Sequence, residues 1–369
     1  MEEKRVLEAL SNVIDPESKK DIVELNWVSN IKIDGNKLNI DLKLKNPAMH
    51  FKKRMEEAIE LHISRYFKDV ELEINMIADA QAPEAPQTPK LLPDVKNIIA
   101  VASGKGGVGK STIASNIAAG LAQKGYSVGI VDADIYGPSI PMMFDTSLEK
   151  PKVNQDSENN LIIPVENYGV KMLSIGFFTQ GDQAVVWRGP MASRALNQMF
   201  SDADWGELDF MIVDLPPGTG DIHLSLVQAV PVTGAVIVST PQEVALIDAK
   251  KAVNMFQGSQ VNVPILGVVE NMAYFTPEEL PDNKYYIFGK NGVEKVTEDL
   301  NIPFLGQVPL VQSIRESGDI GRPAVLQENT IQRESFENVI DNMLEQLEKR
   351  NQLAPPSKKV EMTNENGCA

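Results

Sequence analysis

The chain has 369 residues, a length that suggests two or three domains. Of these residues 43% are hydrophobic and 23% charged, a balance typical of a globular protein. Its formal net charge of −16 argues against nucleic-acid binding, because an acidic surface repels phosphates on average. No apolar run approaches the roughly 18 residues of a membrane helix, and the N-terminus lacks the apolar segment of a secretory signal. The single cysteine, Cys368, excludes an intrachain disulfide. We therefore expect a cytoplasmic protein with no nucleic-acid or membrane partner.

The first 79 residues predict a small α+β domain. Apolar residues at helical spacing indicate helices over 2–13 and about 49–66. Alternating apolar residues predict three strands, and Asp34-Gly35 offers a tight hairpin turn between the first two. The strands are expected at 31–33, 38–44 and 70–76.

A proline-rich linker over 80–94 separates this domain from the rest, because its four prolines favour a stiff, extended chain. Residues 95–353 alternate apolar strand runs with helical patterns, which predicts βαβ units and a mostly parallel sheet flanked by helices. The tail 354–369 has no apolar pattern and is expected to be disordered. The expected strands lie at 98–102, 128–132, 210–214, 234–239, 265–269 and 303–305, and a closing helix at 331–350.

A glycine-rich segment after the first of these strands matches the phosphate-loop pattern of Gly, four residues and Gly-Lys-Ser. Glycines allow the backbone N–H groups to surround phosphates, and a helix that begins at Lys110 adds its dipole. Lys110 is expected to contact the β- and γ-phosphates, and the Ser111 hydroxyl to ligate Mg²⁺. The predicted ATP-binding loop consists of Gly104, Lys105, Gly106, Gly107, Val108, Gly109, Lys110, Ser111 and Thr112.

Two other strands end in aspartates, at Asp132-Ala133-Asp134 and at Asp214. Ligands bind at the carboxyl ends of parallel strands, so these acids are expected to point toward the phosphates. A helix cap is the alternative for an aspartate in such a position. We expect Asp214 to hold Mg²⁺ through a coordinated water, and the turn-rich loop 215–221 to respond to the γ-phosphate.

Lys105 is a second lysine inside the loop, which reads Lys-Gly-Gly-Val-Gly-Lys-Ser-Thr over 105–112. This variant resembles the deviant phosphate loop of the septum-site, partition and nitrogenase-reductase class of dimeric ATPases. The resemblance implies a homodimer in which Lys105 reaches the partner's nucleotide and Asp134 orients the attacking water. Lys105 would then neutralise charge in trans, as an arginine finger does. With Lys110, these are the predicted catalytic residues.

Within that class, the chain is most similar to the Mrp (ApbC) family of iron–sulfur cluster carriers, over nearly all of 95–350. The N-terminal unit, with Asp15-Pro16-Glu17, resembles a small domain often fused to this family. The resemblance implies adenine recognition by Asn271, [4Fe–4S] cluster transfer, and apoprotein clients and assembly factors as partners. The matching segments are 132–139, 187–191, 213–221, 270–272, 287–289 and 313–319.

The sequence departs from that family at the cluster ligands. The family usually carries Cys-x-x-Cys just after the segment at 270–272, but 274–280 contain no cysteine, and 46–50 lack the small domain's usual one. Carboxylates such as those of Glu278, Glu279 and Asp282 are poor substitutes for thiolates. Cys368 is not expected to be a ligand, and His50, His62 and His223 lack ligand spacing.

These observations leave two functions open. The first is an ATP-hydrolysing iron–sulfur cluster carrier or assembly protein, with a partner supplying the missing thiolates. The alternative is an ATP-gated dimeric scaffold that binds clients without holding a cluster itself. A positioning ATPase that cycles on membrane or DNA is disfavoured by the acidic composition and by the acidic face of the closing helix.

Overall fold

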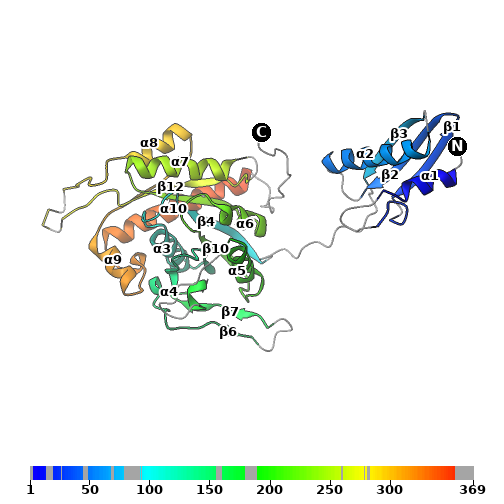
Figure 1. Cartoon of the computed structure of the whole chain (residues 1–369). Helices are drawn as coiled ribbons and strands as arrows, with labels where there is room; N and C mark the ends of the chain where they lie inside the picture. Colours follow the sequence, from blue (N-terminus) through cyan, green and yellow to red (C-terminus); the bar gives the residue numbers. More distant parts are fainter. Residues whose placement is uncertain are drawn as a thin grey trace. The chain divides into compact units, whose positions relative to one another are not determined.

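The computed structural model describes residues 3–13, 20–25, 27–44, 49–67, 70–78, 92, 94–154, 160–178, 189–258, 261–277, 279–280 and 283–353. The chain divides into two compact units, Met1–Pro89 and Lys90–Ala369 (Figure 1). Most of the expected linker and the tail with Cys368 lie outside the described residues, as do 15–17, 46–48, 187–188, Glu278 and Asp282.

The first unit is a three-stranded sheet packed against two helices. Strand order is β1-β2-β3, with β1 and β2 antiparallel and β2 and β3 parallel. Buried side chains alternate along β2, which places Leu38, Ile40 and Leu42 in the core. The elements are α1 (Glu3–Leu10), β1 (Val28–Asp34), β2 (Lys37–Leu44), α2 (Met49–Tyr66) and β3 (Glu71–Ala78).

The predicted hairpin turn is present, with Gly35 at φ +60°. The first helix is shorter than the predicted 2–13, because two polar side chains after Leu10 bind the backbone of its last turn. Ser11 Oγ and Asn12 Nδ2 each donate to the carbonyl oxygen of Glu8, at 2.9 Å. Such local hydrogen bonds compete with continued helix.

The second unit contains an eight-stranded sheet with order β13-β12-β11-β4-β10-β5-β9-β8, parallel except for the β8–β9 pair. The six strands expected from the sequence are all present. The strands are β4 (Val95–Ala102), β5 (Val128–Asp132), β8 (Val165–Asn167), β9 (Val170–Ser174), β10 (Leu208–Asp214), β11 (Gly234–Ser239), β12 (Ile265–Asn271) and β13 (Phe304–Val308).

Sequence reasoning missed β9 and β8. Lys171 interrupts the apolar pattern of β9, so the sequence alone does not indicate a strand there. In the folded protein its ammonium donates a hydrogen bond to the carbonyl oxygen of Trp205 at 2.7 Å. The strand is stabilised by parallel pairing with β5, which only the tertiary fold supplies. A separate two-stranded ribbon joins β6 (Lys152–Val153) to β7 (Ile162–Ile163).

Helices cover both faces of the large sheet (Figure 1). Along β4, Ile98 and Ala100 face a core shared with α5 to α8, whereas Ile99 and Val101 face a core shared with α3 and α10. Both faces are therefore buried, as is usual for a parallel sheet. The helices are α3 (Lys110–Gln123), α4 (Ile140–Met143), α5 (Gly189–Ser201), α6 (Asp221–Ala229), α7 (Glu243–Gln257), α8 (Gly292–Leu300), α9 (Gln312–Asp319) and α10 (Ile331–Leu353).

The predicted closing helix is α10, which extends to Leu353. Its residues Phe336, Val339, Ile340 and Met343 are buried against the sheet. Within the part of the chain that the structure describes, none of the helices combines the length and the apolar character needed to cross a membrane.

Candidate functional site

The glycine-rich loop lies between the end of β4 and the start of α3, at the carboxyl edge of the sheet. Gly107 and Gly109 have φ of +83° and +84°, a region that favours glycine. A side chain at Gly109 would collide with the Asn271 amide, since a Cβ there would lie 2.1 Å from Asn271 Nδ2. The backbone thus follows a path that only glycine permits, with the helix N-terminus at Lys110 available for an anion.

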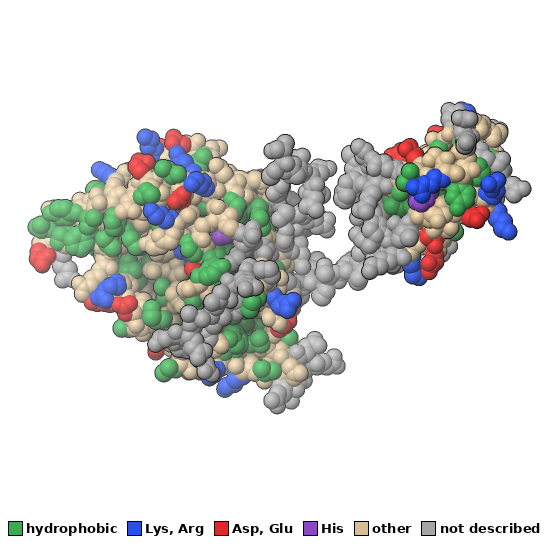
Figure 2. Space-filling view, viewed as in Figure 1, with side chains coloured by type: hydrophobic (Ala, Val, Ile, Leu, Met, Phe, Trp, Pro, Cys, Tyr) green, Lys and Arg blue, Asp and Glu red, His purple; other side chains and the backbone are tan. Residues whose placement is uncertain are grey.

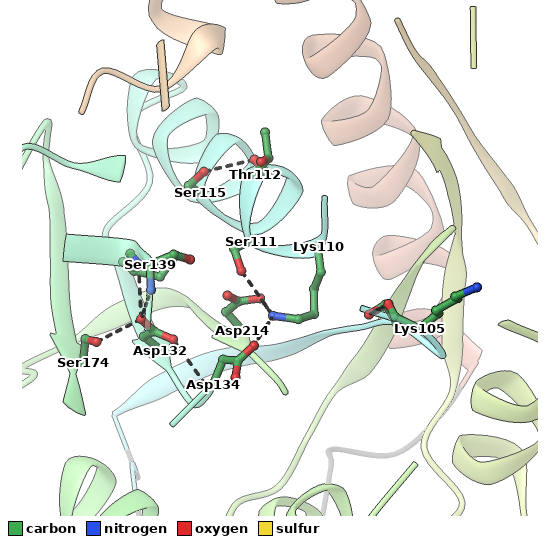
Figure 3. Close-up of polar contacts among 12 residues, drawn as sticks. Lys105, Lys110, Ser111, Thr112, Ser115, Asp132, Asp134, Ser139, Ser174 and Asp214 are labelled. Carbon is green, nitrogen blue, oxygen red and sulfur yellow. Dashed lines mark hydrogen bonds and ion pairs between the residues drawn. The ribbon is translucent and has the colours of Figure 1, made fainter. Parts of the chain in front are cut away.

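Lys110 is buried at the head of α3 between two carboxylates from different strand ends. Its ammonium lies 2.7 Å from Asp214 Oδ1, at the end of β10, and 3.6 Å from Asp134 Oδ2, just after β5. The Ser111 hydroxyl is 3.2 Å from the same ammonium (Figure 3). The fold therefore gathers one cation, two carboxylates and a hydroxyl at one point.

The second oxygen of Asp214 has no hydrogen-bond partner among the described residues. Its Oδ2 is buried and accepts no hydrogen bond from the described residues, while Oδ1 pairs with Lys110. Burial raises the pKa of Asp214, and the Lys110 charge partly offsets this. Carboxylate and hydroxyl oxygens are the ligands that Mg²⁺ prefers, directly or through water. Asp214 and Ser111 therefore fit a magnesium ion.

Asp132 does not share this position. Its Oδ2 accepts hydrogen bonds from the backbone N–H groups of Ser139 and Ile140, at 3.0 and 3.2 Å, and from Ser174 Oγ at 2.9 Å. Burial, together with the nearby Asp214 charge, raises the pKa of Asp132 to about 7. The expectation that the acids of this segment point toward phosphates was wrong for Asp132, which caps the start of α4 instead.

Lys105 is exposed, and its side chain points away from Lys110 (Figure 3). The loop holds its backbone, since Ser103 Oγ donates to the Lys105 carbonyl oxygen at 3.0 Å. Gly104, just before it, packs on α7, where a Cβ would lie 2.1 Å from the Asp248 carbonyl oxygen. Lys105 therefore extends from a fixed base toward solvent rather than toward its own loop.

Asn271 joins the end of β12 to the phosphate loop. Its Nδ2 donates to the Val108 carbonyl oxygen at 2.8 Å, and the residue is buried. A cavity of about 250 Å³ opens beside it and beside Thr112. Side chains of α4 and α9 also line this cavity, and the sequence analysis gave them no role in a site. They include Met142, Met143, Ile314 and Arg315.

Glu270, next to Asn271, has a wholly buried carboxylate. The sequence analysis included it in the matching segment 270–272 but gave it no role. It accepts hydrogen bonds from the Val293 backbone N–H and from Gln307 Nε2, both at 2.8 Å. Burial raises its pKa, which these donors partly offset. Glu270 therefore ties the end of β12 to the start of α8 and to β13.

The structure brings together no iron–sulfur ligands in its described part. No group of three or more His, Cys, Asp or Glu side chains there has metal-site geometry. In the segment that follows β12, Phe275 and Tyr285 exchange two backbone hydrogen bonds, at 2.8 and 2.9 Å.

His223 is buried in α6, its Nδ1 3.3 Å from the Gly220 carbonyl oxygen, and burial lowers its pKa.

Residues 94–344 match the model of the ParA family, described as NUBPL iron-transfer P-loop NTPase. The chain belongs to this family. Residues 3–74 match a second model, described as iron-sulfur cluster assembly protein. The predicted resemblance to iron–sulfur cluster carriers is thereby confirmed.

Curated and solved relatives agree with this assignment. The chain is 46% identical over 327 residues to the iron-sulfur cluster carrier protein of Synechocystis, covering 87% of this chain and 90% of that one. It is 36% identical to a nucleotide-binding protein from Archaeoglobus fulgidus solved in complex with ADP, at a TM-score of 0.55, covering 63% and 89%. The Pyrococcus furiosus cell division ATPase MinD, 22% identical with a TM-score of 0.50 and covering 68% and 99%, shares the fold. The predicted septum-site-ATPase-like fold is confirmed.

Proposed function

We propose that this chain is an Mg²⁺-dependent ATPase that works as a homodimer and couples ATP turnover to the transfer of iron–sulfur clusters to apoproteins. One observation carries the ATPase part: Lys110 is buried at a helix N-terminus between Asp134 and Asp214. The family assignment carries the iron–sulfur part.

A triphosphate bound at the loop would replace Asp134 and Asp214 as the partner of the Lys110 ammonium. The β- and γ-phosphates are stronger partners for a lysine at a helix N-terminus than either carboxylate, since helix dipole and loop amides act on them as well. Asp214 and the Ser111 hydroxyl are then free to hold Mg²⁺, which neutralises phosphate charge when bound. Asp134, released from Lys110, is placed to orient the attacking water.

Lys105 supplies the remaining charge from the partner protomer. It is exposed and directed away from its own loop, so its ammonium is available to a nucleotide outside its own site. As the γ-phosphoryl group departs, a lysine inserted in trans neutralises the developing negative charge, which is how arginine fingers accelerate phosphoryl transfer. Hydrolysis in this proposal requires two copies of the chain.

The cavity beside Asn271 suits the adenine base. Apolar side chains such as Met142 and Met143 can cover the faces of a planar base, while the Asn271 amide can donate to or accept from its edge. Asn271 also contacts the phosphate loop through Val108. Base recognition and phosphate binding would therefore depend on the same side chain.

The cluster is the cargo, and this chain lacks the paired cysteines that would hold it in the family. We propose that assembly factors or the apoprotein client supply the thiolates, since soft sulfur ligands are what a cluster requires. The test is anaerobic reconstitution with iron and sulfide, followed by iron counting and visible absorption. Cluster uptake by the dimer with co-purified partners supports carriage, whereas colourless, iron-free protein in every mixture ends it.

The alternative function, an ATP-gated scaffold that binds clients without a cluster, is favoured by the missing cysteines. Its test uses Asp134→Ala, which should bind ATP without hydrolysing it. If ATP closes the dimer on a client, this variant retains the client longer than the wild type does. Equal client affinity with and without trapped ATP rejects the gating mechanism.

A further inference from the structure

His223 is a buried titratable side chain to which the proposed mechanism gives no role. Figure 2 shows Lys, Arg, Asp and Glu side chains scattered over one face of the second unit, whereas His223 is only 2% exposed. It lies in the first turn of α6, directly after the loop 215–220. Burial of a polar ring costs free energy unless hydrogen bonds compensate for it, so the partners of this imidazole need an explanation.

The loop 215–220 touches the phosphate loop. The Gly218 backbone N–H donates to the Ser103 carbonyl oxygen at 2.8 Å, and a Cβ at Gly106 would lie 3.9 Å from Pro217 Cγ. Gly218 has a φ of +99°, and no atom lies within 4 Å of the position that its Cβ would take. The backbone at Gly218 therefore has both the conformational freedom and the space to move when a phosphate binds nearby.

The His223 ring lies between the end of this loop and α7. Its Nδ1 is 3.3 Å from the Gly220 carbonyl oxygen. The ring also meets Phe256 of α7 edge to face, with centroids 6.3 Å apart and planes at 73°. Because α7 packs on Gly104 as well, His223 connects the loop 215–220 to a helix that contacts the phosphate loop.

The imidazole of His223 is neutral near pH 7. Burial lowers its pKa and the charge of Lys110 adds to this effect, while the carbonyl groups of Gly220 and Pro216 act in the opposite direction. A neutral imidazole carries one N–H and one lone pair. With Nδ1 donating to the Gly220 carbonyl oxygen, Nε2 is a hydrogen-bond acceptor.

This acceptor is not used in the described arrangement. Nε2 is buried and has no hydrogen-bond partner among the residues that the structure describes. A buried acceptor without a donor destabilises the fold, so an arrangement that supplies a donor is favoured over this one. Thr219 and Gly220, exposed at the end of the loop, carry the nearest backbone N–H groups in the sequence that a shift of the loop can turn toward the ring.

We propose that His223 is a positioning residue for ATP, and that its Nε2 accepts a hydrogen bond from the loop 215–220 when this loop closes on the γ-phosphate. The inference deepens the proposed function and rests on it, because the closed loop requires a triphosphate at the phosphate loop. ADP has no γ-phosphate and leaves the contacts of His223 unchanged. A contact made only in the ATP-bound arrangement favours ATP over ADP, since a ligand shifts an equilibrium only through differential affinity.

The test is isothermal titration calorimetry of the full chain with Mg²⁺ and either ADP or a non-hydrolysable ATP analogue. His223→Leu removes both ring nitrogens and keeps an apolar side chain in the buried position. The affinity for the ATP analogue should fall roughly 5-fold or more, as expected for one lost hydrogen bond, while the affinity for ADP stays that of the wild type. A purely structural role would weaken the binding of both nucleotides alike.

Two amide variants distinguish the two ring nitrogens. His223→Gln places an amide near the position of Nε2 and should keep the ratio of the two affinities, whereas His223→Asn reaches only the position of Nδ1 and should lose it. Hydrogen exchange of residues 215–223 gives a second readout: the ATP analogue should protect this segment in the wild type and in His223→Gln alone. His62→Leu is the matched control, because His62 lies in α2 of the first unit. Circular dichroism and thermal unfolding verify folding.

The outcomes separate this inference from the function on which it rests. A loss restricted to the ATP analogue in the Leu and Asn variants, with His223→Gln close to the wild type, supports the inference. Equal losses for both nucleotides, no loss in any variant, or a Gln variant that behaves like His223→Leu each overturn it and leave ATP binding at the phosphate loop standing. A wild-type chain that binds neither nucleotide overturns the proposed function as well.

Discussion

The Lys110 ammonium lies 2.7 Å from Asp214 Oδ1, and this buried ion pair connects the N-terminus of α3 to the end of β10. The two residues are 104 positions apart in the chain. Their other partners differ: Lys110 also contacts Asp134, whereas one oxygen of Asp214 has no hydrogen-bond partner in the part of the chain that the structure describes. The two residues can therefore exchange their contact with each other for new partners: a phosphate for Lys110 and a metal ion for Asp214.

Replacing Lys110 by alanine should abolish tight nucleotide binding. The variant loses the only described cation buried at this helix N-terminus, and it leaves two carboxylates that repel phosphate. Isothermal titration calorimetry with Mg²⁺ and ATP measures the loss. Lys96→Ala is the control, since Lys96 forms an exposed pair with Asp209 far along the sheet from the loop and should bind ATP as the wild type does. Wild-type heat of binding in Lys110→Ala would contradict the site.

Replacing Lys105 by alanine should spare ATP binding and remove hydrolysis, by a factor of roughly 10³ if the lysine acts as a finger in trans. Phosphate release and calorimetry measure the two properties separately. Mixing Lys105→Ala with Lys110→Ala provides a sharper test, because one protomer then retains the nucleotide site and the other the inserted lysine. Recovered activity in the mixture supports action in trans, and wild-type turnover in Lys105→Ala alone excludes it.

Asp132 should make the nucleotide-free protein less stable as the pH rises from about 4 to about 7. Its pKa is about 7 in the folded protein, against about 4 in an unfolded chain. The folded state therefore binds the proton more tightly, and the unfolded chain releases it first, which lowers the free energy of unfolding across this range. Denaturant unfolding at several pH values measures the slope.

Asp132→Asn removes the titration and is the comparison for this slope. The amide keeps an oxygen for the Ser139 and Ile140 N–H groups, although its Nδ2 is a poorer neighbour for the Asp134 N–H. The variant should be less stable at low pH but lose less stability between pH 4 and 7. Parallel slopes in the two proteins would show that Asp132 ionises normally.

Asn271→Ala should weaken ATP binding and reduce the preference for ATP over GTP. The change removes the amide at the cavity and its hydrogen bond to Val108, which costs about 1 kcal/mol of stability by itself. Asn342→Ala is a matched control, because Asn342 Nδ2 makes an equivalent bond to the Leu305 carbonyl oxygen at 2.9 Å. Both variants should lose stability, but only Asn271→Ala should change nucleotide affinity. Unchanged selectivity there would reject adenine recognition.

The sequence by itself was enough for the fold class and the family. Apolar runs separated by helical patterns predicted six strands of the large sheet. Strands of a parallel sheet are buried on both faces, and their sequences are therefore apolar almost throughout. The glycine pattern before Lys110-Ser111-Thr112 predicted a phosphate loop for a local reason, since only glycine permits the backbone path at Gly107 and Gly109. The roles assigned to the site residues stay predictions.

Tertiary structure alone decided which acids face the loop. Asp132 and Asp134 are two residues apart and look equivalent in sequence, yet one caps α4 and the other contacts Lys110. The distinction depends on Ser174 of β9, a strand stabilised by its pairing with β5 rather than by its own apolar pattern. The contact of Asn271 with Val108 has the same origin. Local patterns determine which elements form, but the partners of a polar side chain are set by segments far away in the chain.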